Sequence, residues 1–184
     1  MISYLNKYIS CVLFFVFIDC YSANACDIHG QSGFLPENLV ESAIDQELTG
    51  GISKKKYYKI LKKLKELYSY RALEYGAELR FLDLWDNDKP NAKASRSKSI
   101  WRVNLFGGLA RQYGMSKDAF VIIGCHEIGH HFGGAPTKRF SINLWTSAEG
   151  QADYYATTKC FRKYVADEDN ISIVKSYINQ VPRS

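Results

Sequence analysis

The sequence lacks the features that would place it in a membrane, on nucleic acid or among repeat proteins. After residue 25 it has no apolar run approaching the roughly 20 residues that a membrane-spanning helix needs. It has no internal repeat, no low-complexity tract and no long linker. It also lacks the arginine and aromatic pattern of nucleic-acid binding, so we expect no nucleic-acid partner. Hydrophobic residues make up 46% of the 184, which favours one globular domain.

The first 25 residues differ from the rest and are typical of an export signal. Lys7 precedes a nearly unbroken apolar run over residues 9–18, and small residues follow up to Ala25. We therefore predict a signal peptide over residues 1–25, cleaved after Ala25, and a single domain over residues 26–184. A short buried helix is the alternative. The export compartment, whether periplasm, cell surface or medium, stays open.

Cysteine is scarce in the predicted mature chain. Two of the five cysteines lie in the signal peptide, which leaves Cys26, Cys125 and Cys160. Because three is odd, at least one must be unpaired or modified. Cleavage after Ala25 would make Cys26 the N-terminal residue, so lipid attachment there stays open.

A run of lysines follows Gly50 and Gly51. Apolar residues recur among the lysines at spacings of three and four, which predicts an amphipathic helix capped by Ser53. A solvated face is the ordinary interpretation of such a run. The alternative is contact with an anionic envelope surface or an acidic substrate. The lysines concerned are Lys54, Lys55, Lys56, Lys59, Lys62, Lys63 and Lys65.

The remaining elements predict an α+β fold in which helices dominate and the sheet is small and antiparallel. Caps, breakers and apolar periodicity give the bounds of each element. We expect helices over 36–48, 117–132 with Ser116 as cap, 148–165 with Ser147 as cap, and 171–178, and paired strands over 78–85 and 99–106 joined by a turn-rich loop over 87–97.

Residues 126–130 read His-Glu-Ile-Gly-His, the HExxH pattern. On a helix, His126 and His130 lie on one face and can bind one metal ion. Glu127 is displaced from that face, so its carboxylate can act as a general base without being a ligand. The chain has only four histidines, and three of them lie at 126, 130 and 131.

Two histidines leave a catalytic zinc site one protein ligand short. Eighteen residues after His130, the sequence Glu-Gly-Gln-Ala-Asp begins at Glu149. Asp153 is four residues further on and shares the helical face of Glu149. Without HExxH, this acidic pair would suit the exposed first turn of a helix.

With HEIGH and EGQAD in this order and spacing, the chain resembles the gluzincin metallopeptidases over residues 120–160. The resemblance implies a zincin-like domain with two active-site helices and one Zn²⁺ ion. It implies His126, His130 and Glu149 as ligands, Glu127 as base, and Asp153 as the carboxylate that orients His126. It also implies a protein or peptide substrate lying along the 99–106 strand as an edge strand.

Several residues near the motif are not assigned to the metal. His131 points about 100° away from the ligand face, and His29 is isolated, so we exclude both. The oxyanion-stabilising residue stays open among Tyr154, Tyr155, His131 and Arg139. Cys125 and Cys160 could form a disulfide between the two helices or remain buried thiols. Oligomeric state is not indicated.

The leading function is therefore an exported zinc-dependent peptidase. The alternative is a non-catalytic, zinc-stabilised module that binds a cell-wall or membrane-surface partner. Glu127 favours the enzyme, because a structural zinc site does not need a carboxylate beside its ligands.

Overall fold

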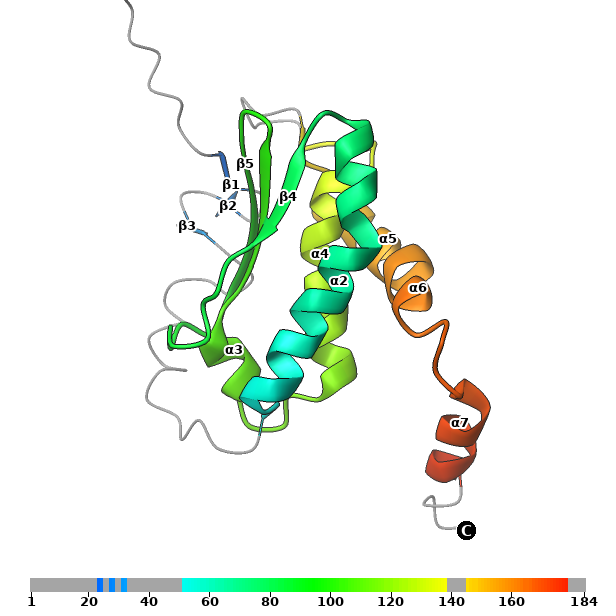
Figure 1. Ribbon diagram of the computed structural model, residues 1–184. Helices are drawn as coiled ribbons and strands as arrows, with labels where there is room; N and C mark the ends of the chain where they lie inside the picture. The colour runs from blue at the N-terminus through cyan, green and yellow to red at the C-terminus, as the bar shows by residue number, and fades with distance from the viewer. Residues whose placement is uncertain (1–22, 25–26, 29–30, 33–50, 139–144, 179–184) are drawn as a thin grey trace, which may run out of the picture.

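The computed structural model describes residues 23–24, 27–28, 31–32, 51–138 and 145–178. The expected helix over 36–48, Cys26, His29, Arg139 and nearly all of the signal peptide lie outside the described residues. The described part is α+β, as predicted, with helices packed against one small sheet (Figure 1). Within these ranges, no helix combines the length and apolarity that crossing a bilayer requires.

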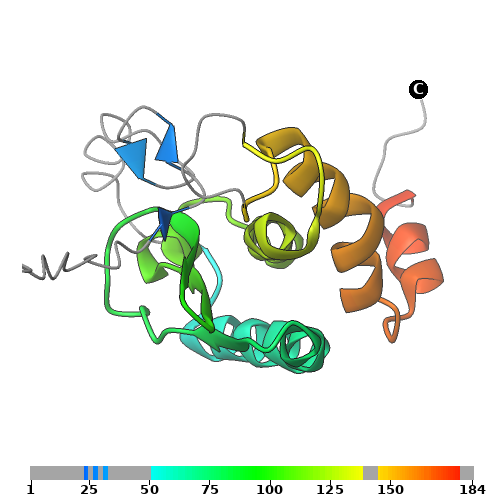
Figure 2. The same ribbon diagram turned by 90° about the horizontal axis from the view of Figure 1, so that it is seen from above.

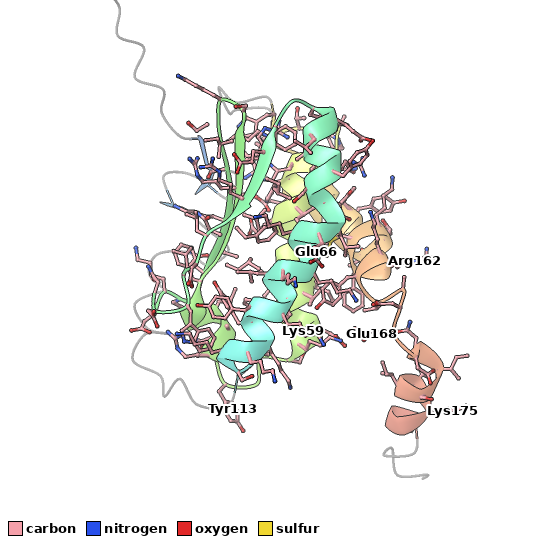
Figure 3. All side chains as sticks on the ribbon, viewed as in Figure 1. Lys59, Glu66, Tyr113, Arg162, Glu168 and Lys175 are labelled. Atoms are coloured by element: carbon pink, nitrogen blue, oxygen red, sulfur yellow. A yellow bond between two sulfur atoms is a disulfide. The ribbon has the colours of Figure 1, made fainter. Side chains whose placement is uncertain are left out.

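The lysine-rich segment forms helix α2 (Lys54–Glu74). The Ser53 hydroxyl caps it by accepting a hydrogen bond from the Lys56 amide. Its apolar stripe is buried, and the Tyr57 hydroxyl donates a 2.7 Å hydrogen bond to the Leu105 carbonyl of the sheet. Lys59 and Glu66 lie on the exposed side of this helix (Figure 3).

The main sheet has the strand order β1-β5-β6-β4. Its strands are β1 (Ala23–Asn24), β4 (Glu78–Phe81), β5 (Ala92–Ser97) and β6 (Ile100–Leu105), and a separate pair consists of β2 (Asp27–Ile28) and β3 (Gln31–Ser32).

The predicted antiparallel pairing of 78–85 with 99–106 is wrong. Much of the predicted loop forms β5, which reverses the chain once more, so β4 and β6 run parallel while β5 and β6 form an antiparallel hairpin. The predicted first strand also ends early, at Phe81. Asp83 accepts hydrogen bonds from the Tyr58 hydroxyl and the Trp85 amide, which turns the chain away from the sheet.

Helix α4 (Lys117–Phe132) has the predicted bounds. The Ser116 hydroxyl accepts a hydrogen bond from the Ala119 amide at its start, and Gly133 is its C-cap. A short helix, α3 (Gly107–Arg111), precedes it and was not predicted. Seen from above, α4 runs between the sheet and the later helices, with α2 beside it (Figure 2).

The predicted 148–165 helix is built from three consecutive segments, which are α5 (Glu149–Tyr155), the π-helical η1 (Ala156–Phe161) and α6 (Arg162–Tyr164). Ala148, not Ser147, holds the N-cap position, because the Ser147 hydroxyl donates to the Gly134 carbonyl instead. The last helix, α7 (Asn170–Ile178), begins one residue before its predicted start.

The core lies between the sheet, α2 and α4. Its fully buried side chains include Leu64, Leu105, Phe120 and Ile128. Each such side chain contributes about 1.5–3 kcal/mol through burial. This packing fixes α4, the helix of the HExxH motif, against the sheet.

Candidate metal centre

Helices α4 and α5 approach each other closely at Gly129, the glycine within HEIGH. A Cβ atom at this position would lie 2.7 Å from the Ala152 carbonyl oxygen. Only glycine allows this separation without displacing the backbone of α5. The motif therefore supplies both the histidines and the close helix contact that brings α5 to them.

His126 and His130 from α4 meet Glu149 from α5. Glu149 Oε2 lies 3.0 Å from His126 Nε2 and 3.4 Å from His130 Nε2. One ligand atom from each of the three residues falls within 4.8 Å of the other two. Atoms bound at about 2.0–2.2 Å around one tetrahedral ion lie about 3.3–3.6 Å apart. The group could therefore hold a metal ion with little rearrangement.

The second nitrogen of His126 is held by Asp153. His126 Nδ1 lies 2.8 Å from Asp153 Oδ1, so this nitrogen donates and Nε2 is left to face Glu149. Burial lowers the pKa of His126, but the hydrogen bonds that its ring donates to the Glu149 and Asp153 carboxylates, together with the nearby Glu127 charge, outweigh burial and raise this pKa to about 9.

His130 is fully buried and is oriented by the backbone. Its Nδ1 donates to the Ser147 carbonyl over 3.0 Å, which again leaves Nε2 facing Glu149. The Ser147 amide donates in turn to the His130 carbonyl. We call the described residues 133–138 and 145–148 the α4–α5 connection. This connection orients the His130 imidazole, as Asp153 orients that of His126.

The α4–α5 connection is tied to itself and to both helices. The Ala148 amide donates to the Pro136 carbonyl over 2.8 Å, and the Lys138 amide donates to the Thr146 carbonyl over 3.1 Å. The Gln151 side chain donates to the Gly133 carbonyl at the end of α4. Carbonyls that α4 leaves unpaired at its end are thus satisfied by the segment that starts α5.

Glu149 is a carboxylate surrounded by cationic and imidazole partners. Burial would raise its pKa, but the close contacts of the carboxylate with His126, His130 and the Lys138 ammonium outweigh this and hold the pKa well below its usual range. The carboxylate is therefore ionised, as a metal ligand must be.

Glu127 lies beside the ligands and is fully buried at 0% exposure. Its negative charge acts on the His126 imidazole, which places the carboxylate near the ligand group. A buried carboxylate costs free energy unless neighbouring groups compensate it. A metal ion bound to the neighbouring ligand group would provide this compensation.

A disulfide joins Cys125 of α4 to Cys160 of η1. The sequence alone did not decide between this bridge and two buried thiols. Cys125 directly precedes His126, and Cys160 lies in the same continuous helical segment as Glu149 and Asp153. The bridge therefore holds together the two elements that carry the candidate ligands.

His131 lies outside the ligand group, as the sequence predicted. Its ring stacks on Trp101 at 5.3 Å and on Trp145 at 5.2 Å. Its Nε2 donates to the Arg102 carbonyl, and Arg96 donates to its Nδ1 and to its carbonyl. Burial lowers its pKa to about 3, so the ring is neutral. This stack packs the end of α4 against Trp101 of the sheet and Trp145 of the α4–α5 connection.

Three of the four candidates for oxyanion stabilisation lie in the described residues, and two of these three are buried in other contacts. His131 is held in its stack, and Tyr155 is buried with its hydroxyl accepting from Arg71. Tyr154 is 58% exposed on α5.

The expected edge strand is wrong. β6 lies inside the sheet, between β5 and β4, and β5 in turn pairs with β1. The residue pattern could not reveal this, because it gave no strand at β5.

Comparison of the chain with family models, with curated proteins and with solved structures found no match.

Two contributors to the site were missed by sequence reasoning. The Ser147 carbonyl orients His130, and Lys138 Nζ lies 2.7 Å from Glu149 Oε1. Backbone carbonyls carry no residue signature, and Lys138 lies in a segment that the glycine and proline breakers marked only as a helix end. Lys138 and Glu149 belong to no common helix, so their separation of eleven residues carries no periodic signal.

Proposed function

We propose that the protein is an exported, zinc-dependent peptidase with a gluzincin-like site. The observation that carries the proposal is a fully buried glutamate, Glu127, beside three converging ligand side chains. A site that only stabilises the fold would need the ligands and not the extra carboxylate.

Zinc is the proposed ion because of the donor set. Two imidazole nitrogens and one carboxylate oxygen are typical of catalytic zinc, which keeps a further position open. Zinc bound there would act as a Lewis acid toward a substrate carbonyl and would make a water molecule more acidic.

The chain's own residues supply the remaining steps. Glu127 accepts the proton of the attacking water and later delivers a proton to the departing amine. Asp153 and the Ser147 carbonyl hold the two imidazoles through Nδ1 with Nε2 facing Glu149, where these three residues would hold the ion. Water adds to the amide carbon, the C–N bond breaks, and a carboxylate and an amine leave.

Export is supported by two features. The N-terminal sequence resembles a signal peptide, and the Cys125–Cys160 disulfide is of a kind that persists in oxidising compartments.

The test is digestion of a peptide library by residues 26–184 and by the Glu127→Gln variant. The variant should keep its zinc and lose about 10²–10⁴-fold in kcat, because the base is gone while the ligands remain. Glu66→Gln, an exposed change on α2, serves as the control and should cleave like the wild type. Equal cleavage by Glu127→Gln and wild type would reject the peptidase. Zinc binding by the wild type without cleavage of any peptide would favour the binding module.

A further inference from the structure

Lys138 contacts the candidate metal centre without belonging to its ligand group. Its Nζ lies 2.7 Å from Oε1 of Glu149, and its side chain is 16% exposed. Glu149 Oε2 is the oxygen that faces both imidazoles. The two oxygens of one carboxylate therefore have separate partners.

The position of Lys138 is fixed by its backbone. Its amide donates to the Thr146 carbonyl over 3.1 Å, and neighbouring Thr137 forms a β-bridge with Ser147. Ser147 is the residue whose carbonyl orients His130. The lysine thus extends from the same backbone pairing that holds one of the ligands.

The separation of the two oxygens has a consequence for coordination. A carboxylate can bind a metal ion through one oxygen or through both. An ammonium on Oε1 forms a charge-assisted contact that competes with the second mode. Glu149 is 37% exposed at its side chain, so packing alone does not fix its orientation.

We propose that Lys138 is a positioning residue that holds Oε1 of Glu149, so that this ligand presents Oε2 alone and leaves a coordination position free for substrate. The proposal rests on the proposed function, since it concerns the same metal ion. A lysine that formed only a surface ion pair would leave metal binding unchanged.

The test compares Lys138→Met and Lys138→Arg in the metal-free protein, residues 26–184. Zinc affinity is measured by competition with a chelator, and Co²⁺ is added separately to record the visible spectrum, which reports coordination number. Lys138→Met should bind zinc about 10-fold more weakly, as for loss of other groups that orient ligands, and should change the Co²⁺ spectrum. Lys138→Arg keeps a cation at Oε1 and should restore both properties toward those of the wild type.

Two controls make the result specific. Lys159→Met removes an exposed lysine of η1 and should change neither measurement. In a Glu149→Gln background, Lys138→Met should have little further effect, because its action passes through the carboxylate. Thermal unfolding of each metal-free variant checks that the fold is retained, and Lys138→Gln replaces Lys138→Met if that variant does not fold.

The outcomes separate the two proposals. Failure of the wild type to bind zinc or Co²⁺ would reject the metal centre itself. Metal binding by the wild type, with the same zinc affinity and Co²⁺ spectrum in Lys138→Met, would reject the role of Lys138 and leave the peptidase proposal standing.

Discussion

The two charged regions of the molecule, helix α2 and the crossing of α4 with α5, handle charge in opposite ways. On α2, most lysines are exposed, and the pairs Lys54–Asp86 and Lys62–Glu66 are 3.7 and 3.8 Å long. Such contacts contribute about 0–1 kcal/mol. At the α4–α5 crossing, His126, His130 and Glu127 are buried. Buried charge there requires compensation by neighbouring groups, so substitutions at the crossing should have far larger effects than those on α2.

At the crossing, removal of the disulfide should have the largest effect on stability. Replacing both Cys125 and Cys160 by alanine should lower the free energy of unfolding by about 3–4 kcal/mol, because the bridge closes a loop with a sequence separation of 35. Urea unfolding of the metal-free protein measures this. A loss below about 1 kcal/mol would mean that the bridge does not hold the two helices together.

A matched pair of glycines tests the close approach of the helices. Gly129→Ala should lower the free energy of unfolding by about 2–3 kcal/mol, because its Cβ would lie 2.7 Å from backbone of α5. Gly150→Ala, whose Cβ would meet nothing within 4 Å, should be neutral or stabilising by about 0.5–1 kcal/mol. Equal effects of the two changes on chemical denaturation would contradict the described crossing.

Asp153 should matter through His126. Asp153→Asn keeps the size of the side chain but removes the charge that faces His126 Nδ1 over 2.8 Å. Zinc affinity should fall by about 10-fold, with little change in metal-free stability, as measured by chelator competition and by thermal unfolding. Unchanged affinity would show that the imidazole is oriented by other groups.

The smallest effects are expected on α2. Lys55→Gln combined with Lys59→Gln, both at exposed positions, should change the free energy of unfolding by less than about 0.5 kcal/mol and leave zinc affinity unchanged. If this face meets an anionic envelope surface, the double variant should bind anionic lipid vesicles more weakly, by about 1 kcal/mol per lysine. A large decrease in the free energy of unfolding or in zinc affinity would contradict the difference between the two regions.

The helices were predictable because their signals are local. Ser116 and Gly133 mark the ends of α4, and Ser53 marks the start of α2. His126 and His130 followed from helical spacing, and the resemblance to the gluzincin pattern implied Glu149 as the third ligand. Periodicity therefore located the parts of the centre that lie on one helical face.

The sheet was less predictable because its decisive strand has a weak pattern. β5 reads Ala-Lys-Ala-Ser-Arg-Ser, and its inward positions at Ala92 and Ala94 are small. Alanine and serine have little strand propensity, so tertiary pairing with β6 determines the strand. Once β5 is missed, the direction of β4 relative to β6 is necessarily predicted wrongly.

The contacts that orient the ligands were predictable only where they come from a helix. The resemblance implied Asp153, and its spacing of four residues placed it on the helical face of Glu149. Ser147 and Lys138 act from the α4–α5 connection, whose path depends on backbone pairing and not on periodicity.

The central claim is that His126, His130 and Glu149 together bind one metal ion. The most direct measurement is elemental analysis of residues 26–184, purified without chelator and then dialysed against zinc-free buffer, beside the His130→Ala variant. The wild type should retain one zinc ion per chain, and the variant should retain almost none because its two remaining ligands do not complete the site. A wild type without bound metal, or a variant with the same zinc content as the wild type, would contradict the account.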